Sequence, residues 1–515
     1  MPSHGGARPP ERGKVGWGLF PSLAALLLLH STGAAASLDP DLVSKFSIVL
    51  PAAASLHGLP PAFFHSDVAV LNTSIRRIAE VTAVYRCNGG SCGNALRTFN
   101  VAPRQVLLLE DVVGNFFGAP ETSGAIEFSS TERIVVTSHL YTPARPSPTF
   151  GMLVPGLTPA EALVDVELVN LSHSADPSVG YRTNLAIYNP TDQTLSAFIG
   201  CRDFRSAALG FMTQDVGPHQ LLQINDGDLF REFGVLRNVS SFNCSIRGGF
   251  LTPFYSWASV LDNVSNDLTF VRAQQFFAVP RPHTIPAVAS LHGVGGTFFR
   301  SDVAIFNDDV LAGADVIATY RCLQGSCPVS DRFLSLGPGE TRILADAVGS
   351  FFAAPESSGS IEFVTSGHIS VTSRLYAPAS GGGTVGTSVP AVDSRAATPS
   401  RVLVLMPRGS RVNVGVVNFE DVAQRVRIRL FSAAGEFLGD IARVVDRRQS
   451  AQVNDVFGEL GITADLAAAY CLVEGEGSLR ILAYAAIIDN ESQDSIFVSG
   501  EDDPDTPRVN LRSTP

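Results

Sequence analysis

The feature that most constrains the fold of this 515-residue chain is an internal duplication. A shift of 235 residues aligns Pro51–Tyr141 with Pro286–Tyr376 without a gap, and roughly half of the aligned positions are identical. The segment FFHSDVAVLN, for example, returns as FFRSDVAIFN. Because two copies of so similar a sequence must fold alike, the chain consists of two equivalent halves.

A weaker repeat lies inside each half. The same strand motif recurs as YRTNLAIYN and SRVNVGVVN, and its Asp or Asn positions are 117, 118 and 111 residues apart. That spacing matches one small sandwich domain, so we predict four modules in the order A-B-A-B. The motif positions are Asp67, Asn184, Asp302 and Asn413. The predicted modules are A1 (46–160), B1 (161–276), A2 (280–390) and B2 (400–500).

Each module has the pattern of an all-β fold. Segments such as VTAVYRC and RIVVTSHLY are rich in β-branched and aromatic residues and are separated by turn residues. One short segment per module, such as NDGDLFREFG, has helix start and stop signals. Amphipathic runs long enough for crossover helices do not occur at the required spacing, which argues against a parallel α/β fold. We therefore expect β-sandwiches that each contain one short helical turn.

The motifs GTFFRSDVAIFN and LGPGETRILADAVGSFF resemble tandem immunoglobulin-like β-sandwich repeats of secreted bacterial proteins. The resemblance covers about residues 46–500 and implies four such sandwiches. It implies no activity, because a fold of this kind hosts many functions. The Cys…Trp…Cys pattern of true immunoglobulin domains does not occur, so the strand topology stays open.

The N-terminus has the pattern of a signal peptide over residues 1–36. Arg8, Arg12 and Lys14 precede the apolar run LFPSLAALLLL, and small residues follow up to Ala36. No transmembrane segment is expected after cleavage, so the mature chain should be secreted, periplasmic or at the cell surface. The near absence of lysine indicates GC-rich coding and hence a bacterial gene.

Three further segments are predicted from composition. The linker AQQFFAVPRPHTIP between the halves contains proline and should be semi-rigid. The Gly/Ser-rich stretch PASGGGTVGTSVPAVDSRAATPS should be a mobile loop or linker. Residues 501–515 should form a disordered tail.

Seven cysteines suggest disulfides in an exported protein. Cys87 and Cys92 enclose four residues, as do Cys322 and Cys327 at the equivalent place, so each pair should bridge locally. In B1, Cys201 and Cys244 are the only candidates for each other and should tie two strands across the sandwich. The remaining cysteine, Cys471, is predicted to be a free core thiol, with an intermolecular bridge as the alternative.

Composition and motifs exclude several function classes. A net charge of −12 and the lack of a basic stripe argue against nucleic-acid binding. We find no motif of a catalytic, metal or cofactor site. The acidic stretches FNDDVLAGAD, INDGDLF and GEDDPDTP lack the spacing of a calcium loop, and calcium stays an open alternative. His57 and His292 share a repeat position best explained by a strand end, and Glu127 and Glu362 should face solvent.

Two function classes remain. The first is a non-catalytic extracellular or cell-surface binding or structural protein, whose partner is an extracellular protein or a glycan. Repetition favours it, because tandem modules give multivalent contact without an active site. The alternative is an enzyme or carbohydrate-binding protein with a site at a module interface. The B modules would carry that site, since they mix Arg with aromatic residues such as Trp257.

Overall fold

The computed structural model of the chain describes residues 46–503 apart from residues 59, 61, 89–91, 93, 143–148, 276–279, 324–326, 328 and 476–479. The predicted signal peptide, residues 1–36, lies outside the described residues. We keep the labels A1, B1, A2 and B2, call each a quarter, and let each quarter include the elements given for it below, some of which extend a few residues past the predicted ranges.

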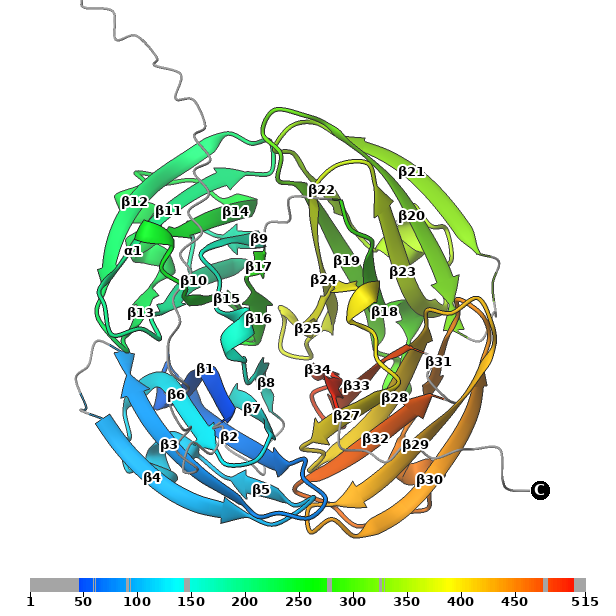
Figure 1. The fold of residues 1–515 in the computed structure, drawn as a ribbon. Helices are drawn as coiled ribbons and strands as arrows, with labels where there is room; N and C mark the ends of the chain where they lie inside the picture. The colour runs from blue at the N-terminus through cyan, green and yellow to red at the C-terminus, as the bar shows by residue number, and fades with distance from the viewer. Residues whose placement is uncertain are drawn as a thin grey trace, which may run out of the picture. The chain divides into compact units, whose positions relative to one another are not determined.

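Quarter A1 consists of antiparallel strands that form two sheets joined through their first strand (Figure 1). The strand orders are β4-β3-β6-β1 and β5-β2-β7-β8. Strand β1 joins them, because it pairs with β6 as far as Ser55, across a bulge between Leu50 and Ala53, and with β2 from Leu56. The elements are β1 (Phe46–His57), β2 (Phe63–Asn72), β3 (Ala79–Cys87), β4 (Asn94–Val101), β5 (Val106–Leu109), η2 (Val112–Phe116), β6 (Thr122–Ser130), β7 (Ile134–Thr142) and β8 (Phe150–Pro155).

Quarter B1 repeats this order as two separate sheets, β12-β11-β14-β9-β17 and β13-β10-β15-β16. Its helix α1 occupies the place that η2 has in A1. The elements are η3 (Pro159–Glu161), β9 (Asp165–His173), β10 (Tyr181–Tyr188), β11 (Leu195–Asp203), β12 (Ala208–Val216), β13 (Leu221–Ile224), α1 (Asp226–Glu232), β14 (Val239–Gly248), η4 (Gly249–Leu251), β15 (Tyr255–Asp262), β16 (Leu268–Arg272) and β17 (Gln274–Gln275).

Quarter A2 repeats A1, with the orders β21-β20-β23-β18 and β22-β19-β24-β25 joined through β18 and β19. The elements are β18 (His283–His292), η5 (Val294–Gly296), β19 (Phe298–Asn307), β20 (Ala314–Cys322), β21 (Ser330–Leu336), β22 (Thr341–Leu344), η7 (Ala347–Phe351), β23 (Ser357–Thr365), β24 (Ile369–Pro378), β25 (Thr384–Pro390), β26 (Val392–Asp393) and η8 (Ser394–Ala396).

Quarter B2 repeats B1, with the orders β30-β29-β32-β27-β35 and β31-β28-β33-β34. The described strands thus form antiparallel sheets in every quarter, with a short helix at the equivalent place of each, namely η2, α1, η7 and α2. The elements are β27 (Ser400–Leu405), β28 (Ser410–Asn418), β29 (Gln424–Ser432), β30 (Phe437–Val445), β31 (Ser450–Val453), α2 (Val456–Glu459), β32 (Ala469–Gly475), β33 (Ile481–Asp489), β34 (Ser495–Ser499) and β35 (Glu501–Asp502).

The strand order differs from that of immunoglobulin domains. In those domains the first strand shares a sheet with the second, and the last strand pairs with the sixth. Here most of β1 pairs with β6, whereas β7 pairs with β2. The first and seventh strands have thus exchanged sheets relative to the immunoglobulin arrangement.

Burial patterns explain why these segments form strands. Along β3 every second residue is buried, from Ala79 through Tyr85, which is the period of a strand with one face on a core. Strand β7 is buried at all nine positions. It is covered on both faces because one packs into A1 and the other meets B2, where Val135 shares an apolar cluster with Val402.

The last strands of the second sheets connect the quarters. Strand β8 lies against β16, β16 against β25, β25 against β34, and β34 against β8. Each quarter therefore contacts the next one in the chain, and the last quarter contacts the first.

Two segments differ from their compositional predictions. The Gly/Ser-rich stretch predicted to be mobile contains β25, because β24 and residues of B1 supply its partners. The predicted tail from residue 501 begins with β35, which pairs with β27, and Asp503 binds Arg104. Residues 504–515 lie outside the described residues.

Candidate functional site

The four repeat-motif positions all make the same hydrogen bond. In each quarter the side-chain oxygen accepts from a backbone N–H at the start of the short helix. The acceptor needs only an oxygen, which explains why Asp and Asn alternate. The acceptors and donors are Asp67 and Asp111 (2.9 Å), Asn184 and Asp226 (3.2 Å), Asp302 and Asp346 (2.8 Å), and Asn413 and Asp455 (3.0 Å).

Sequence reasoning missed a second polar set, the asparagines that end the same four strands. Each is at most 1% exposed, and its side-chain N–H donates to backbone carbonyls beyond the following turn over 2.7–3.1 Å. Their signal was the fourfold recurrence of Asn at the strand end. The set consists of Asn72, Asn189, Asn307 and Asn418.

The structure joins six cysteines into three disulfides, in the pairs that the sequence suggests. These are Cys87–Cys92, Cys201–Cys244 and Cys322–Cys327. The second bridge does not cross the sandwich, because Cys201 and Cys244 lie opposite each other on neighbouring strands of one sheet.

Cys471 is free and buried, and it occupies in B2 the place that Cys244 has in B1. Its partner across the strand pair is Leu430, where B1 has Cys201. Burial raises the pKa of the Cys471 thiol, which keeps it protonated and unreactive. The unpaired cysteine is thus one half of a bridge position whose other half is leucine.

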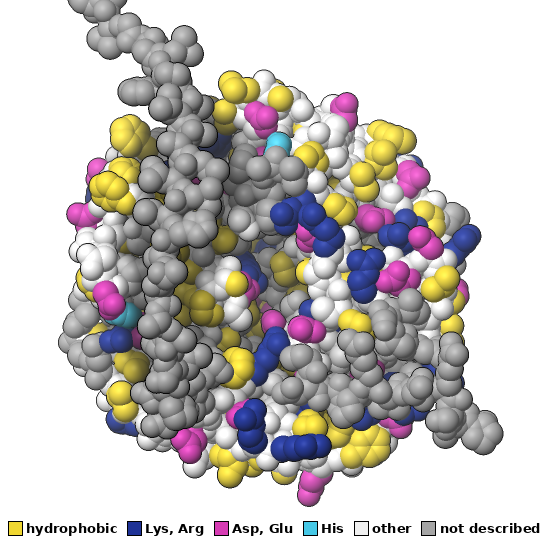
Figure 2. Space-filling view, in the orientation of Figure 1, with side chains coloured by type: hydrophobic (Ala, Val, Ile, Leu, Met, Phe, Trp, Pro, Cys, Tyr) yellow, Lys and Arg dark blue, Asp and Glu magenta, His cyan; other side chains and the backbone are white. Residues whose placement is uncertain are grey.

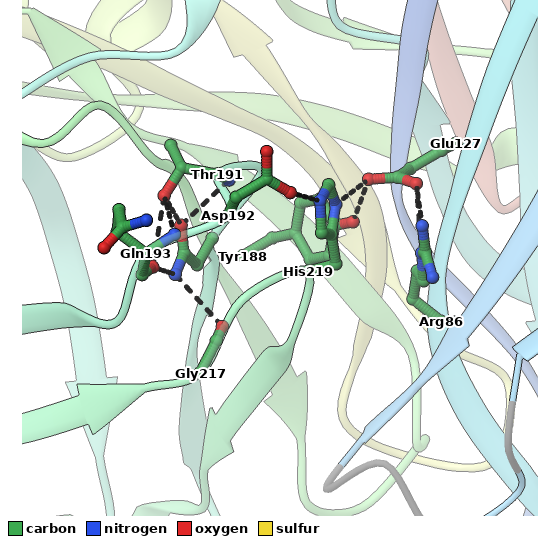
Figure 3. Close-up of polar contacts among 9 residues, drawn as sticks. Arg86, Glu127, Tyr188, Thr191, Asp192, Gln193, Gly217 and His219 are labelled. Carbon is green, nitrogen blue, oxygen red and sulfur yellow. Dashed lines mark hydrogen bonds and ion pairs between the residues drawn. The ribbon is translucent and has the colours of Figure 1, made fainter.

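A polar cluster lies between A1 and B1, with Glu127 at its centre (Figure 3). The carboxylate accepts from the Tyr188 hydroxyl at 2.5 Å and from Arg86 at 2.8 Å. It also lies 2.8 Å from Nδ1 of His219, whose Nε2 is 2.9 Å from Asp192. Burial alone would raise the pKa of Glu127, but these donors hold it below its ordinary value. Glu127 is 22% exposed, so the prediction that it faces solvent is wrong.

The second half keeps the glutamate–arginine pair of this junction but replaces the histidine. Glu362 pairs with Arg321 at 3.4 Å, and Arg448 stands where the first half has His219. Arg448 binds Asp421 at 2.9 Å, and the charge of Glu362 also reaches it. In the first half, burial would lower the pKa of His219, but the hydrogen bonds to its two carboxylate partners raise it.

The other singled-out side chains form local pairs. His57 lies 2.8 Å from Glu121, and His292 lies 2.8 Å from Glu356, both on the surface at a strand end. Among the described residues no three His, Cys, Asp or Glu side chains are grouped to hold a metal ion. Asp309, from one of the acidic stretches, accepts from two N–H groups of its own turn.

A pocket lies between the two quarters of each half, with a volume of about 630 Å³ in the first and about 1030 Å³ in the second. Both pockets are lined by the same positions of the duplicated chain. From the A quarter these are Ala52, Ala54, Leu56 and Phe64, and Ala287, Ala289, Leu291 and Phe299. From the B quarter they are Arg182, Asn184, Asp226 and Asn263, and Arg411, Asn413, Asp455 and Asn490.

The apolar wall depends on small residues. Alanines of β1 and β18 leave room that larger side chains would fill. Gly58 lets the Phe64 ring lie against the backbone, since an added Cβ would be 2.4 Å from that ring. Gly293 does the same for Phe299, at 2.6 Å. Both pockets therefore have an apolar wall of the same construction.

The polar wall is an arginine held by neutral amides. Arg182 donates to Asn263 at 2.7 Å and to Asn266 at 3.2 Å. In the second pocket Arg411 donates to Gln493 at 2.8 Å and to the asparagine equivalent to Asn263 at 3.3 Å. Burial lowers the pKa of both arginines, while two nearby carboxylates in each pocket raise it. The charge of each arginine is thus balanced without direct ion pairing.

The two pockets differ at several lining positions, among them one aromatic position and one rim. Trp257 lines the first, and Tyr484 takes its place in the second. At the first rim, Nδ1 of His173 lies 2.7 Å from Asp226, and its ring stacks on Phe230. Burial raises the pKa of Asp226.

The described surface has mixed character. On the face drawn in Figure 2, arginine and acidic side chains are scattered among apolar ones. The described residues contain no helix with the length and apolarity needed to cross a bilayer.

Comparison with known proteins gives no family. No family model matches the chain, and no curated protein matches it. A solved structure described as "Crystal structure of tetra-tandem repeat in extending region of large adhesion protein" is similar at 12% identity. That alignment covers 85% of this chain and 96% of the other, with a TM-score of 0.10.

Proposed function

We propose that the chain is an exported, non-catalytic binding protein that holds one ligand in each pocket between an A and a B quarter. The observation that carries this proposal is the repeated polar wall. Arg182, Asn184, Asp226 and Asn263 have identical counterparts in the second half. The two B quarters differ at other places, for example at the disulfide that B2 lacks.

The pocket chemistry favours an uncharged ligand group with an apolar face and an oxygen acceptor. Phe64 and Trp257 offer apolar surface, and Arg182 with the Asn184 amide offers donors. An anion gains little, because Asp226 and a second carboxylate already balance the arginine. A sugar ring or an aromatic side chain of an extracellular protein has this chemistry.

The same proposal covers the organisation of the chain. We take the four quarters as tandem sandwich modules, immunoglobulin-like apart from the exchanged first and seventh strands, that pair to form the two sites. The three disulfides suit an extracellular or periplasmic location. Two sites on one chain would give avidity for a repetitive surface.

The first test uses Trp257, which is the only tryptophan after residue 36. Neutral mono- and disaccharides and N-acetylated aromatic amino-acid amides are titrated into oxidised Ser37–Pro515 while its fluorescence is followed. We expect a saturable change. The variant Arg182→Met should weaken binding at least about 10-fold, since a hydrogen bond to a charged donor contributes about 1.5–3 kcal/mol.

The second pocket has its own reporter. In the double variant Trp257→Phe/Tyr484→Trp, the same ligand should change the fluorescence from the other half, and Arg411→Met should weaken that signal. The exposed helix residue Arg231 provides the matched control, as Arg231→Met. Binding that neither pocket arginine affects would contradict the proposal.

A further inference from the structure

Two junctions of the molecule are built from equivalent backbone positions. Between B1 and A2, the N–H of Thr341 donates to the carbonyl of Phe204 at 2.9 Å. Between B2 and A1, the N–H of Val106 donates to the carbonyl of Ala433 at 2.8 Å. These four residues occupy matching positions of the duplication. One junction joins quarters that are consecutive in the chain, and the other joins the last quarter to the first.

At both junctions, two aspartates of the same hairpin turn accept hydrogen bonds from backbone N–H groups of the same segment. At B1/A2, Asp262 accepts from the N–H of Thr384 at 2.9 Å, and Asp267 accepts from Gly386 at 2.8 Å. At B2/A1 the counterparts are Asp489, bound by Thr149 at 3.4 Å, and Asp494, bound by Gly151 at 2.9 Å. The B2 face therefore recognises A1 as the B1 face recognises A2.

The B2/A1 junction has side chains suited to an interface that lacks a chain connection. A buried apolar cluster joins Leu71 and Val106 of A1 to Val404, Tyr470 and Leu472 of B2. The matching cluster at B1/A2 consists of only three buried residues, Val169, Ala304 and Phe306.

Three ion pairs add to this cluster, the longest of them Arg133–Asp502 at 4.0 Å. Arg104 binds Asp503 at 2.7 Å, with the side chains 13% and 0% exposed. Arg408 binds Glu110 at 2.7 Å nearer the surface. At B1/A2 the position of Arg104 is held by Gly339, so the Arg104–Asp503 pair has no counterpart there.

We propose that the B2/A1 junction is a self-sufficient interface that can open, and that its two faces then join two copies of this chain into a domain-exchanged dimer. Both faces are on one chain. Once the junction is open, the A1 face of each copy can therefore bind the B2 face of the other. Exchange of identical contacts between copies forms a dimer without any new interface. Closure within one chain prevails at low concentration, because the linked faces meet at a high effective concentration.

The test uses two full-length variants with opposite changes. One carries Arg104→Glu and Glu110→Arg on the A1 face, and the other carries Asp503→Arg and Arg408→Glu on the B2 face. In either variant alone, both altered pairs become like-charged. When the two are mixed, every pair is complementary between chains. Light scattering should give the monomer mass for each variant alone and twice that mass for the mixture.

Two controls accompany this mixture. A chain with all four changes should remain a closed monomer, because its reversed pairs again match. Reversal of the exposed Arg231–Asp228 pair, split over two chains in the same way, should leave the mixture monomeric. A mixture of the junction variants that stays at the monomer mass, while the four-change chain is closed, overturns the proposal.

If the four-change chain does not form a closed monomer, the proposal is tested on the unmodified chain instead. Tagged and untagged copies are opened together in moderate urea at high concentration and then returned to buffer. Co-purification of untagged with tagged chain, at twice the monomer mass, supports exchange. Absence of any mixed species overturns it.

Discussion

The B1/A2 and B2/A1 junctions have the same backbone but opposite side-chain chemistry. At B1/A2 the facing positions are polar: Asn243 donates to Thr341 at 2.6 Å, and Ser245 donates to Glu167. Burial raises the pKa of Glu167 to about 7, so this carboxyl is close to neutral in its site. A junction of this kind contributes little apolar burial.

At B2/A1 the three equivalent positions are Val402, Tyr470 and Leu472, and all three are buried. The difference follows from the chain connection. B1 and A2 are consecutive, so their contact costs little entropy of association, whereas B2 must find A1 across the length of the chain. The junction without a connection therefore has the composition of a protein–protein interface.

The largest expected effect comes from removing the aromatic side chain at the apolar junction. Tyr470→Ala should lower the free energy of unfolding by about 3 kcal/mol, as other large-to-small changes at buried aromatic sites do. The matched variant is Asn243→Ala at the polar junction, which removes a donor to Thr341 and an acceptor for the N–H of Asn170 and should cost about 2 kcal/mol. Urea unfolding of both variants measures the difference. Equal losses would remove the contrast between the two junctions.

The second prediction concerns pH at the polar junction. Glu167 has a raised pKa, so its stabilising contribution is present below the ordinary value of 4.5 and is lost as the pH rises through about 7. The charges that face it are Arg202, Asp308 and Asp165. Glu167→Gln stays neutral and should gain about 2 kcal/mol over the unmodified chain at pH 8 but little at pH 4.

Thermal or urea unfolding from pH 4 to 8 measures this effect. The B2/A1 junction has Val402 at the same position and should show no such dependence. If Glu167→Gln and the unmodified chain have parallel pH profiles, Glu167 is not the buried carboxyl described here.

A smaller effect is expected at the repeat motif, which all quarters share. Asp302→Ala removes the acceptor for the N–H of Asp346 and should cost about 1–2 kcal/mol. Asp302→Asn should cost much less, because Asn184 and Asn413 make the same bond in the B quarters. Melting temperatures of the two variants test this order. Equal destabilisation would show that the negative charge matters, contrary to the alternation of Asp and Asn.

The smallest expected effect is a difference in pH-dependent stability between the A1/B1 and A2/B2 junctions. The pKa of His219 is raised, so its contribution is present below about pH 6.5 and is lost as the pH rises through the raised pKa. His219→Arg imitates Arg448 of the second half and should abolish that loss. Because His219 is 30% exposed, the change should be about 0.5 kcal/mol. Unfolding at pH 6 and 8 measures it, with Arg448→His expected to introduce the dependence in the other half.

Local and repeated features of the fold could be predicted from the sequence. The spacing of Asp67 and its counterparts predicts that one strand motif recurs four times, and the four-residue spacer between Cys87 and Cys92 predicts their bridge. These features depend on residues close in sequence or on the duplication itself.

Features that depend on distant partners could not be predicted. The segment around β25 reads as a flexible linker, since the aspartates that bind it, Asp262 and Asp267, lie in B1. Glu127 alternates with apolar neighbours like a solvent-facing residue, but Tyr188 and His219 cover it. A site at a module interface with Trp257 is the alternative that the sequence offers, but the other lining residues could not be predicted, because the two walls come from different quarters.

In this account the two halves bind each other through two equivalent junctions, B1/A2 and B2/A1, and B2/A1 needs no chain connection. The most direct test inserts a protease site between Gln275 and His283 and cuts the folded, oxidised chain there. We predict that the two halves remain one particle on size-exclusion chromatography, held by the clusters and ion pairs of B2/A1 as well as by B1/A2. Separation of the halves at micromolar concentration would contradict the account.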